Sequence, residues 1–143
     1  MVGHDRQAAS HPLRRLDVSV RATREAAAKA RLALRELDLP LPLANNARLA
    51  VSELVTNSVQ HAGLAPDDLI RVTVDWSGAQ LKVHVRDGRQ GVRPAVVSGS
   101  IRPAPGAESG WGLYLVDRVA SRWGTSADGY WFELRQDPPR HGG

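Results

Sequence analysis

Hydrophobic and polar residues alternate in three stretches of the chain, and this period of two is typical of β-strands with one buried face. The stretches are 16–20 (LDVSV), 69–76 (LIRVTVDW) and 81–87 (LKVHVRD), and 130–135 (YWFELR) is predicted to form a last strand. Ser77 and Gly78 separate the second stretch from the third, which predicts a hairpin between these two strands.

Apolar residues recur at helical spacing in three other segments. Thr23 is placed to cap the first helix, whose apolar positions are Ala27, Ala30, Leu34 and Leu37. The prolines of 37–42 (LDLPLP) end this helix, because proline lacks a backbone N–H and restricts the residue before it. A second helix is predicted over 43–61, before Gly63 and Pro66, and a third over 110–124 (GWGLYLVDRVASRWG).

The order of these elements is β-α-α-β-β-loop-α-β, which predicts helices layered on one sheet in an α/β (α+β) two-layer sandwich. A loop rich in glycine and proline occupies 88–109, and a loop of this length is typically either a functional lid or a disordered stretch. One domain is expected over 13–135, with flexible tails at 1–12 and 136–143.

Composition is that of an ordinary globular protein, with 42% hydrophobic and 24% charged residues. The start of the chain has no apolar signal segment and no apolar run is long enough to cross a membrane, so a cytoplasmic protein without a membrane partner is expected. The net charge of +4 fits either an acidic ligand or a solvated arginine-rich face. Aromatic residues make up only 5%, and no basic–aromatic motif predicts direct nucleic-acid binding.

Three polar residues recur every fourth position along the helix predicted over 43–61, at Glu53, Asn57 and His61. Because successive residues turn by about 100°, this column borders an apolar stripe formed by Ala47, Ala50, Val51, Leu54, Val55 and Ser58. The solvent side is marked by Ser52, Thr56 and Gln60. One interpretation is that these are plain residues at the boundary between core and solvent. The other is that they are functional, with the amide oxygen of Asn57 binding Mg²⁺ and the carboxylate of Glu53 accepting a proton.

Two glycine-containing stretches hold further candidates. In 85–92 (VRDGRQGV), Asp87 ends a strand and precedes glycine, which fits either a turn or an acceptor for a base amino group at the mouth of a pocket. In 108–119 (ESGWGLYLVDRV), Gly110 and Gly112 begin an amphipathic helix. This fits either a flexible helix entry or an anion site, because exposed N–H groups at a helix start attract phosphate. Neither the dinucleotide fingerprint nor a P-loop is present.

The order and spacing of these stretches resemble the GHKL (histidine-kinase-like) ATPase superfamily, and within it the small anti-sigma-factor serine/threonine kinases of bacteria. The segment 53–62 (ELVTNSVQHA) is similar to the N box of that family, 85–91 (VRDGRQG) to its G1 box, and 110–124 with 130–134 to its G2 box and closing strand. The resemblance implies the Bergerat ATP-binding fold, in which helices cover one face of a mixed, mostly antiparallel sheet.

The resemblance also implies roles for individual residues. Glu53 matches the general base, Asn57 the residue that holds Mg²⁺ against the triphosphate, and Asp87 the acceptor for the adenine amino group. The glycines at the pocket and phosphate lid correspond to Gly91, Gly110 and Gly112. Trp111 and Leu113, in the same G2-like box, are counted with the nucleotide-binding residues; Trp111 either covers the phosphate loop or packs on the lid.

Two departures from the family pattern bear on nucleotide binding. Arg89 stands where the G1 box has its middle glycine, and the segment 127–134 (ADGYWFEL) lacks the small hydroxyl residue or lysine that commonly precedes the closing strand. An arginine at this position either crowds the adenine side or forms an outward ion pair.

The resemblance implies a kinase that uses ATP and Mg²⁺ to phosphorylate a serine or threonine of an anti-anti-sigma (STAS-type) partner, and that sequesters a sigma factor. The alternative is a non-catalytic module of the same fold that binds its partner with weak or no nucleotide binding. A homodimer is a further expectation from the family. The catalytic domain of a sensor histidine kinase is disfavoured, because 143 residues leave no room for a dimerisation helix pair.

Overall fold

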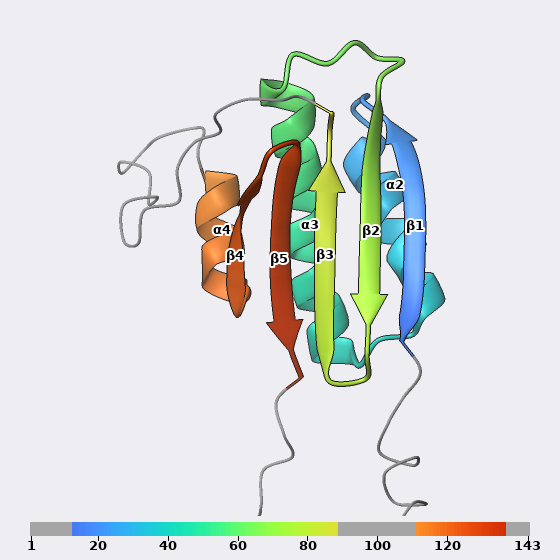
Figure 1. Ribbon diagram of the computed structural model, residues 1–143, viewed down its shortest axis with the longest axis vertical. Helices are drawn as coiled ribbons and strands as arrows, with labels where there is room; N and C mark the ends of the chain where they lie inside the picture. Colours follow the sequence, from blue (N-terminus) through green and yellow to red (C-terminus); the bar gives the residue numbers. More distant parts are fainter. Residues whose placement is uncertain (1–12, 89–110, 137–143) are drawn as a thin grey trace, which may run out of the picture.

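The computed structural model describes residues 13–88 and 111–136, which form one sheet with helices packed on a single face (Figure 1). The elements are β1 (Arg14–Arg21), α2 (Ala26–Ala33), the 3₁₀ helix η1 (Leu34–Leu37), α3 (Leu41–His61), β2 (Leu69–Trp76), β3 (Gln80–Arg86), α4 (Trp111–Val119), β4 (Arg122–Ser126) and β5 (Gly129–Arg135). The expected tails and the predicted loop 88–109 lie outside the described residues, apart from Gly88 and Gln136.

The strand order in the sheet is β1-β2-β3-β5-β4, and every pair of neighbours is antiparallel. The predicted hairpin is confirmed: Trp76 of β2 pairs with Leu81 of β3, and the N–H of Ser77 donates to the carbonyl of Gln80 at 3.1 Å. The last strand of the sequence, β5, inserts between β3 and β4. The two-layer α+β class is therefore confirmed.

Alternation along the strands separates a buried face from an open face. In β2 the side chains of Ile70, Val72 and Val74 are at most 1% exposed and face the helices, and Leu81, Val83 and Val85 of β3 extend the same apolar layer. The residues between them point to the other face, which none of the helices of residues 13–88 and 111–136 covers (Figure 1). Period-two patterning is what a sheet with one packed face requires, so these strands were predictable from the sequence.

Arginines on the open face are paired with acidic residues. Arg71 donates to Asp17 at 2.9 Å, and Arg15, Arg86 and Arg122 lie 3.6–3.8 Å from Asp75, Asp128 and Glu133. The Arg122 guanidinium and the Lys82 ammonium also flank the indole ring of Trp131, at 5.7 and 5.8 Å. This part of the basic excess therefore forms the solvated arginine-rich face that was one of the two interpretations of the charge.

Helix α3 carries the predicted apolar stripe, and all six of its stripe residues are buried. The prediction for Ser52 was wrong, because its side chain is only 9% exposed. Its hydroxyl accepts a hydrogen bond from Arg31 of α2 at 2.9 Å and donates to the carbonyl of Arg48 at 2.7 Å. A helical wheel describes one helix alone, whereas α2 packs beside α3 and covers this position.

Two predicted helix boundaries were also wrong. The first helix begins at Ala26, three residues after Thr23, and no side chain caps it; the Thr23 carbonyl instead accepts the N–H of Ala26 in a turn. The third helix ends at Val119 rather than at Gly124, and the chain then forms β4 along the edge of β5. Trp123 continues the helical spacing of apolar residues, but its indole N–H donates to Asp117 of α4 from the neighbouring strand, at 2.9 Å.

None of the helices in the described segments combines the length and the apolar character needed to cross a bilayer.

Candidate functional site

The predicted site residues that the structure describes gather at one end of the sheet. The second half of α3, the end of β3, the start of β5 and the start of α4 lie together at the upper end of the view (Figure 1). Gly91 and Gly110, together with Arg89, lie outside the described residues. The remaining predicted residues are on these four elements or directly after β3.

Glu53 and Asn57 stand one turn apart on α3 and are both half-buried. They lie between the buried stripe of the helix and its exposed residues, as the wheel predicted. His61, the third member of the column, is exposed at the last position of the helix. A carboxylate and a carboxamide in this position remain accessible to a ligand while the helix beneath them is fixed by its packed face.

The Asn57 side chain is held by a tyrosine of the closing strand. Its Nδ2 donates a hydrogen bond to Tyr130 Oη at 3.1 Å, and Tyr130 is only 3% exposed. Tyr130 lies on β5 opposite Val85 of β3, two residues before Asp87. The sequence predicted only that Tyr130 lies in the last strand, because no pattern in the sequence names its partner 73 positions away.

Asp87 is buried directly after β3, with 4% of its surface exposed. Its backbone N–H donates to the carbonyl of Asp128 at 2.9 Å, so the turn between β4 and β5 fixes the position of the chain here. Gly88 follows with φ +79°, a left-handed conformation that glycine adopts without steric cost. The described residues show no turn at Asp87 and Gly88, so the predicted Asp-Gly turn is not observed there; the buried carboxylate lies at the end of the sheet where Asn57 and Tyr130 lie.

The first turn of α4 lies against Glu53. A Cβ atom added at Gly112 would stand 3.5 Å from Glu53 Oε1, so a methyl group at this position would be in van der Waals contact with the carboxylate. Leu113 is partly buried and packs against the core, and Trp111 contacts Tyr114 edge-on with ring centroids 5.5 Å apart. The two helices that carry the N-box-like and G2-like segments therefore meet at the general-base candidate.

Ser58 supplies a polar group that the sequence analysis counted only as part of the apolar stripe. Its side chain is 1% exposed, and within the described part of the chain its hydroxyl has no hydrogen-bond partner. Leaving a buried hydroxyl unsatisfied costs about 1–3 kcal/mol, so a ligand atom or a bound water at this end of the molecule would stabilise it.

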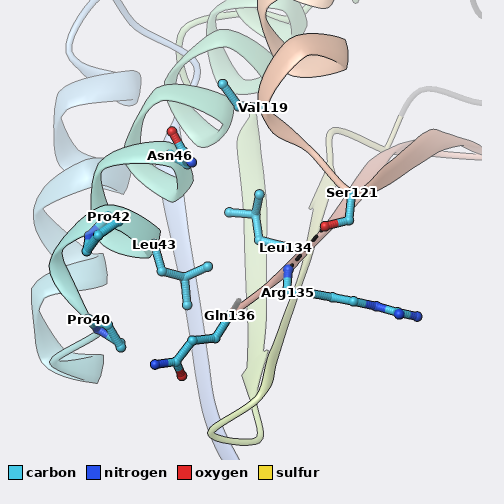
Figure 2. Close-up of a pocket in the computed structure, with 9 residues that line it drawn as sticks. All are labelled: Pro40, Pro42, Leu43, Asn46, Val119, Ser121, Leu134, Arg135 and Gln136. Carbon is cyan, nitrogen blue, oxygen red and sulfur yellow. Dashed lines mark hydrogen bonds between the residues drawn. The ribbon is translucent and has the colours of Figure 1, made fainter. Parts of the chain in front are cut away.

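A separate pocket of about 340 Å³ lies at the opposite end of the helical layer (Figure 2). Pro40, Leu43 and Asn46 at the start of α3 line it, with Val119 at the end of α4 and Leu134 of β5. It contains none of the predicted site residues. Helix α4 reaches both ends, because its first turn contacts Glu53 and its last residue lines this pocket.

His84, Ser126 and Asp128 form a hydrogen-bonded row on the open face that does not fit nucleophilic catalysis. Arg86 has only N–H donors and lies 3.1 Å from His84 Nδ1, so that nitrogen is the acceptor and Nε2 carries the proton. Nε2–H then donates to Ser126 Oγ at 2.9 Å, and Ser126 donates to Asp128 at 3.3 Å. Burial, followed by the charge of Arg86, holds the pKa of His84 below its ordinary value, so the imidazole stays neutral.

Comparisons with known proteins give the family. The sequence matches the Histidine kinase-like ATPase domain over residues 16–131, which includes Glu53, Asn57, Asp87 and the start of α4. The chain belongs to this family, and the resemblance to histidine-kinase-like ATPases is confirmed. No curated protein sequence matches the chain significantly.

A crystal structure of the RsbU and RsbW domains of Rv1364c from Mycobacterium tuberculosis has a similar fold. The TM-score is 0.57 at 24% sequence identity, and the match covers 91% of this chain but 35% of that one. This chain therefore spans about a third of the length of that protein. At this identity the likeness establishes a shared fold.

Proposed function

We propose that this chain binds ATP with Mg²⁺ at the upper end of the sheet and transfers the γ-phosphate to a serine or threonine of an anti-anti-sigma protein. The unphosphorylated partner competes with a sigma factor for this chain. Phosphorylation stops the partner from competing, so the sigma factor stays sequestered. The observation that carries the proposal is the approach of Gly112 at the start of α4 to Glu53 of α3, with Asn57 one turn further along α3 and the buried Asp87 directly after β3. Membership of the histidine kinase-like ATPase family and the likeness to an RsbW-containing structure support it.

Each residue has a distinct task in this scheme. Asp87 accepts the amino group of adenine from its buried position directly after β3. The Asn57 oxygen contributes one protein ligand to Mg²⁺, which otherwise binds water and phosphate oxygens. Gly112 leaves the first turn of α4 without a side chain beside Glu53, and the N–H groups of a helix start attract phosphate.

Glu53 is the proposed general base. Its carboxylate accepts the proton of the partner's hydroxyl as that oxygen attacks the γ-phosphorus and the bond to the β-phosphate oxygen breaks. Phosphoryl transfer demands little covalent chemistry from the protein, so positioning of the hydroxyl and neutralisation of charge by Mg²⁺ supply most of the acceleration. The contact between Glu53 and the start of α4 places the base beside the segment that would hold the phosphates.

Transfer of radiolabelled γ-phosphate from ATP to candidate anti-anti-sigma proteins tests the proposal. Glu53→Ala and Glu53→Gln are expected to reduce transfer by about 10²–10⁴-fold, the contribution of a general base, while ATP affinity is kept. Glu25→Gln, an exposed change at the start of α2, is the matched control and is expected to transfer normally. Continued transfer by the Glu53 variants would overturn the assignment of the base.

A second candidate function is a binding module that holds its partner without phosphorylating it. Arg89 in the G1-like segment favours this candidate, since the family pattern has glycine there. Stable partner binding without label transfer, from a chain that is folded and saturated with ATP, would support the module and contradict the kinase. A homodimer remains a prediction from the family, to be checked by sedimentation.

A further inference from the structure

The hydrogen bond between Asn57 and Tyr130 links two parts of the site that the family pattern treats separately. Tyr130 projects from β5 toward α3, is 3% exposed, and accepts the N–H of Asn57 Nδ2 at 3.1 Å. Its strand is held on both sides, by β3 and by β4. A Cβ atom at the preceding Gly129 would stand 1.8 Å from the carbonyl oxygen of Val85, which shows how closely β5 packs there. The phenol hydroxyl therefore stands on a rigid element.

We propose that Tyr130 is a positioning residue for Asn57, and that it orients the carboxamide so that its oxygen is presented to the cation of Mg·ATP. This inference rests on the proposed function, because it assumes that Asn57 meets Mg²⁺. Tyr130 acts through Asn57 and is not assigned a contact with the metal.

The hydrogen bond to Tyr130 determines which way the oxygen of the Asn57 carboxamide points. The NH₂ group donates and the oxygen accepts, and the two lie on opposite sides of the planar group. Because Nδ2 is bound to Tyr130, Oδ1 points away from the phenol. A hard cation binds only the oxygen, so a carboxamide fixed in this orientation is ready for Mg²⁺, whereas a freely rotating one presents the oxygen for part of the time.

A purely structural role is the competing account, in which the bond only ties α3 to the sheet. The two accounts differ in what removal of the hydroxyl does. Loss of a structural tie lowers stability and weakens ATP binding to the same extent with and without Mg²⁺. Loss of a positioning contact reduces the gain in ATP affinity that Mg²⁺ provides, and leaves the affinity without Mg²⁺ unchanged.

The experiment is a calorimetric titration of the full chain with ATP, in excess Mg²⁺ and in EDTA, for the unaltered protein, Tyr130→Phe, Asn57→Ala and the double variant. Tyr130→Phe is expected to keep its affinity in EDTA within about twofold and to lose about 3–10-fold of the Mg²⁺ enhancement, the range for one hydrogen bond. Asn57→Ala is expected to lose most of the enhancement, and adding Tyr130→Phe to it changes nothing further. Tyr114→Phe removes the other tyrosine hydroxyl of the chain and serves as the matched control.

The outcomes separate this inference from the proposed function. If the unaltered chain binds ATP with a Mg²⁺ enhancement and Tyr130→Phe keeps all of it, or weakens binding equally in Mg²⁺ and EDTA, the positioning role is overturned and the proposed function stands. If the unaltered chain does not bind ATP, both fall.

A second measurement covers the case in which Tyr130→Phe does not fold. In the unaltered chain the side-chain amide hydrogens of Asn57, observed by NMR, are expected to exchange slowly before and after Mg·ATP is added. Fast exchange after the addition would mean that Asn57 leaves Tyr130 on binding, which contradicts the inference.

Discussion

Gly112 lies against the carboxylate of Glu53, so that a Cβ atom at position 112 would stand 3.5 Å from Oε1. The start of α4 and the N-box-like segment of α3 are thus in direct contact, although 59 positions separate them in the sequence. In the proposed function, the distance between these two segments sets how closely the phosphates of ATP and the Glu53 carboxylate approach one another.

Substitutions at Gly112 should show whether the Glu53 carboxylate tolerates one added atom beside it but not a larger side chain that displaces it. Gly112→Ala adds an atom at an ordinary contact distance, so stability and phosphoryl transfer are expected to change little. Gly112→Val adds branches that push the carboxylate or the helix aside, and transfer is expected to fall by about 100-fold, since a displacement of about 1 Å has this effect. Ala28→Val on the exposed side of α2 is the control, and equal transfer rates for all three variants would contradict the account.

Among the glycines that the structure describes, Gly129 should be the one whose replacement destabilises the fold most. A methyl group at this position would overlap the carbonyl oxygen of Val85, which is backbone and part of the β3–β5 ladder. Gly129→Ala is expected to lower the free energy of unfolding by more than about 3 kcal/mol, as other severe overpacking and backbone effects do. Gly63→Ala, at φ +68° but with open space around it, should lose about 1 kcal/mol. Urea unfolding measures both, and equal losses would show that the ladder adjusts.

The pH dependence of stability should contain a contribution from His84. Because burial and Arg86 lower its pKa in the folded chain, the unfolded chain takes up a proton first as the pH falls. The stability associated with the neutral imidazole is therefore complete above the ordinary pKa of about 6.5 and declines as the pH falls below it toward the lower folded value. Urea midpoints at pH 8 and pH 5.5 should differ less for His84→Gln than for the unaltered chain.

Asp17 also contributes to the pH dependence of stability, but at a lower pH than His84, so the two contributions can be measured separately. Its hydrogen bond from Arg71 holds the pKa of the carboxyl below its ordinary value, so this stabilisation is lost only as the pH falls below about 4. An identical pH profile for His84→Gln and the unaltered chain between pH 8 and pH 5.5 would contradict the role given to His84.

The sequence predicted those features that depend on local periodicity. The strand at 69–76 was predicted with its observed bounds, and six of the buried residues of α3 were predicted as its apolar stripe, because a packed face leaves a regular apolar pattern. The same pattern placed Glu53 and Asn57 at the edge of the packed face.

Features that depend on a second element could not be predicted in this way. Trp123 extended the helical pattern of α4, yet the edge of β5 draws residues 122–126 into a strand. Ser52 was placed in solvent, because the wheel of one helix does not include α2. Tyr130 was predicted only as a strand residue, because its hydrogen bond to Asn57 depends on the position of β5 beside β3 in the sheet.

The most direct test of the account is the affinity of the chain for ATP and GTP, measured for the unaltered protein, Asp87→Asn and the exposed control Asp67→Asn. A carboxylate at Asp87 accepts the amino group of adenine but repels the carbonyl oxygen at the same position of guanine. We therefore expect ATP to bind more tightly than GTP, and Asp87→Asn to weaken ATP binding by about 10–100-fold, the range for a hydrogen bond to a charged group. An unaltered chain that ignores millimolar ATP, or an Asp87→Asn variant that binds ATP as tightly as the control, would contradict the proposal that one purine nucleotide is held at this end of the sheet.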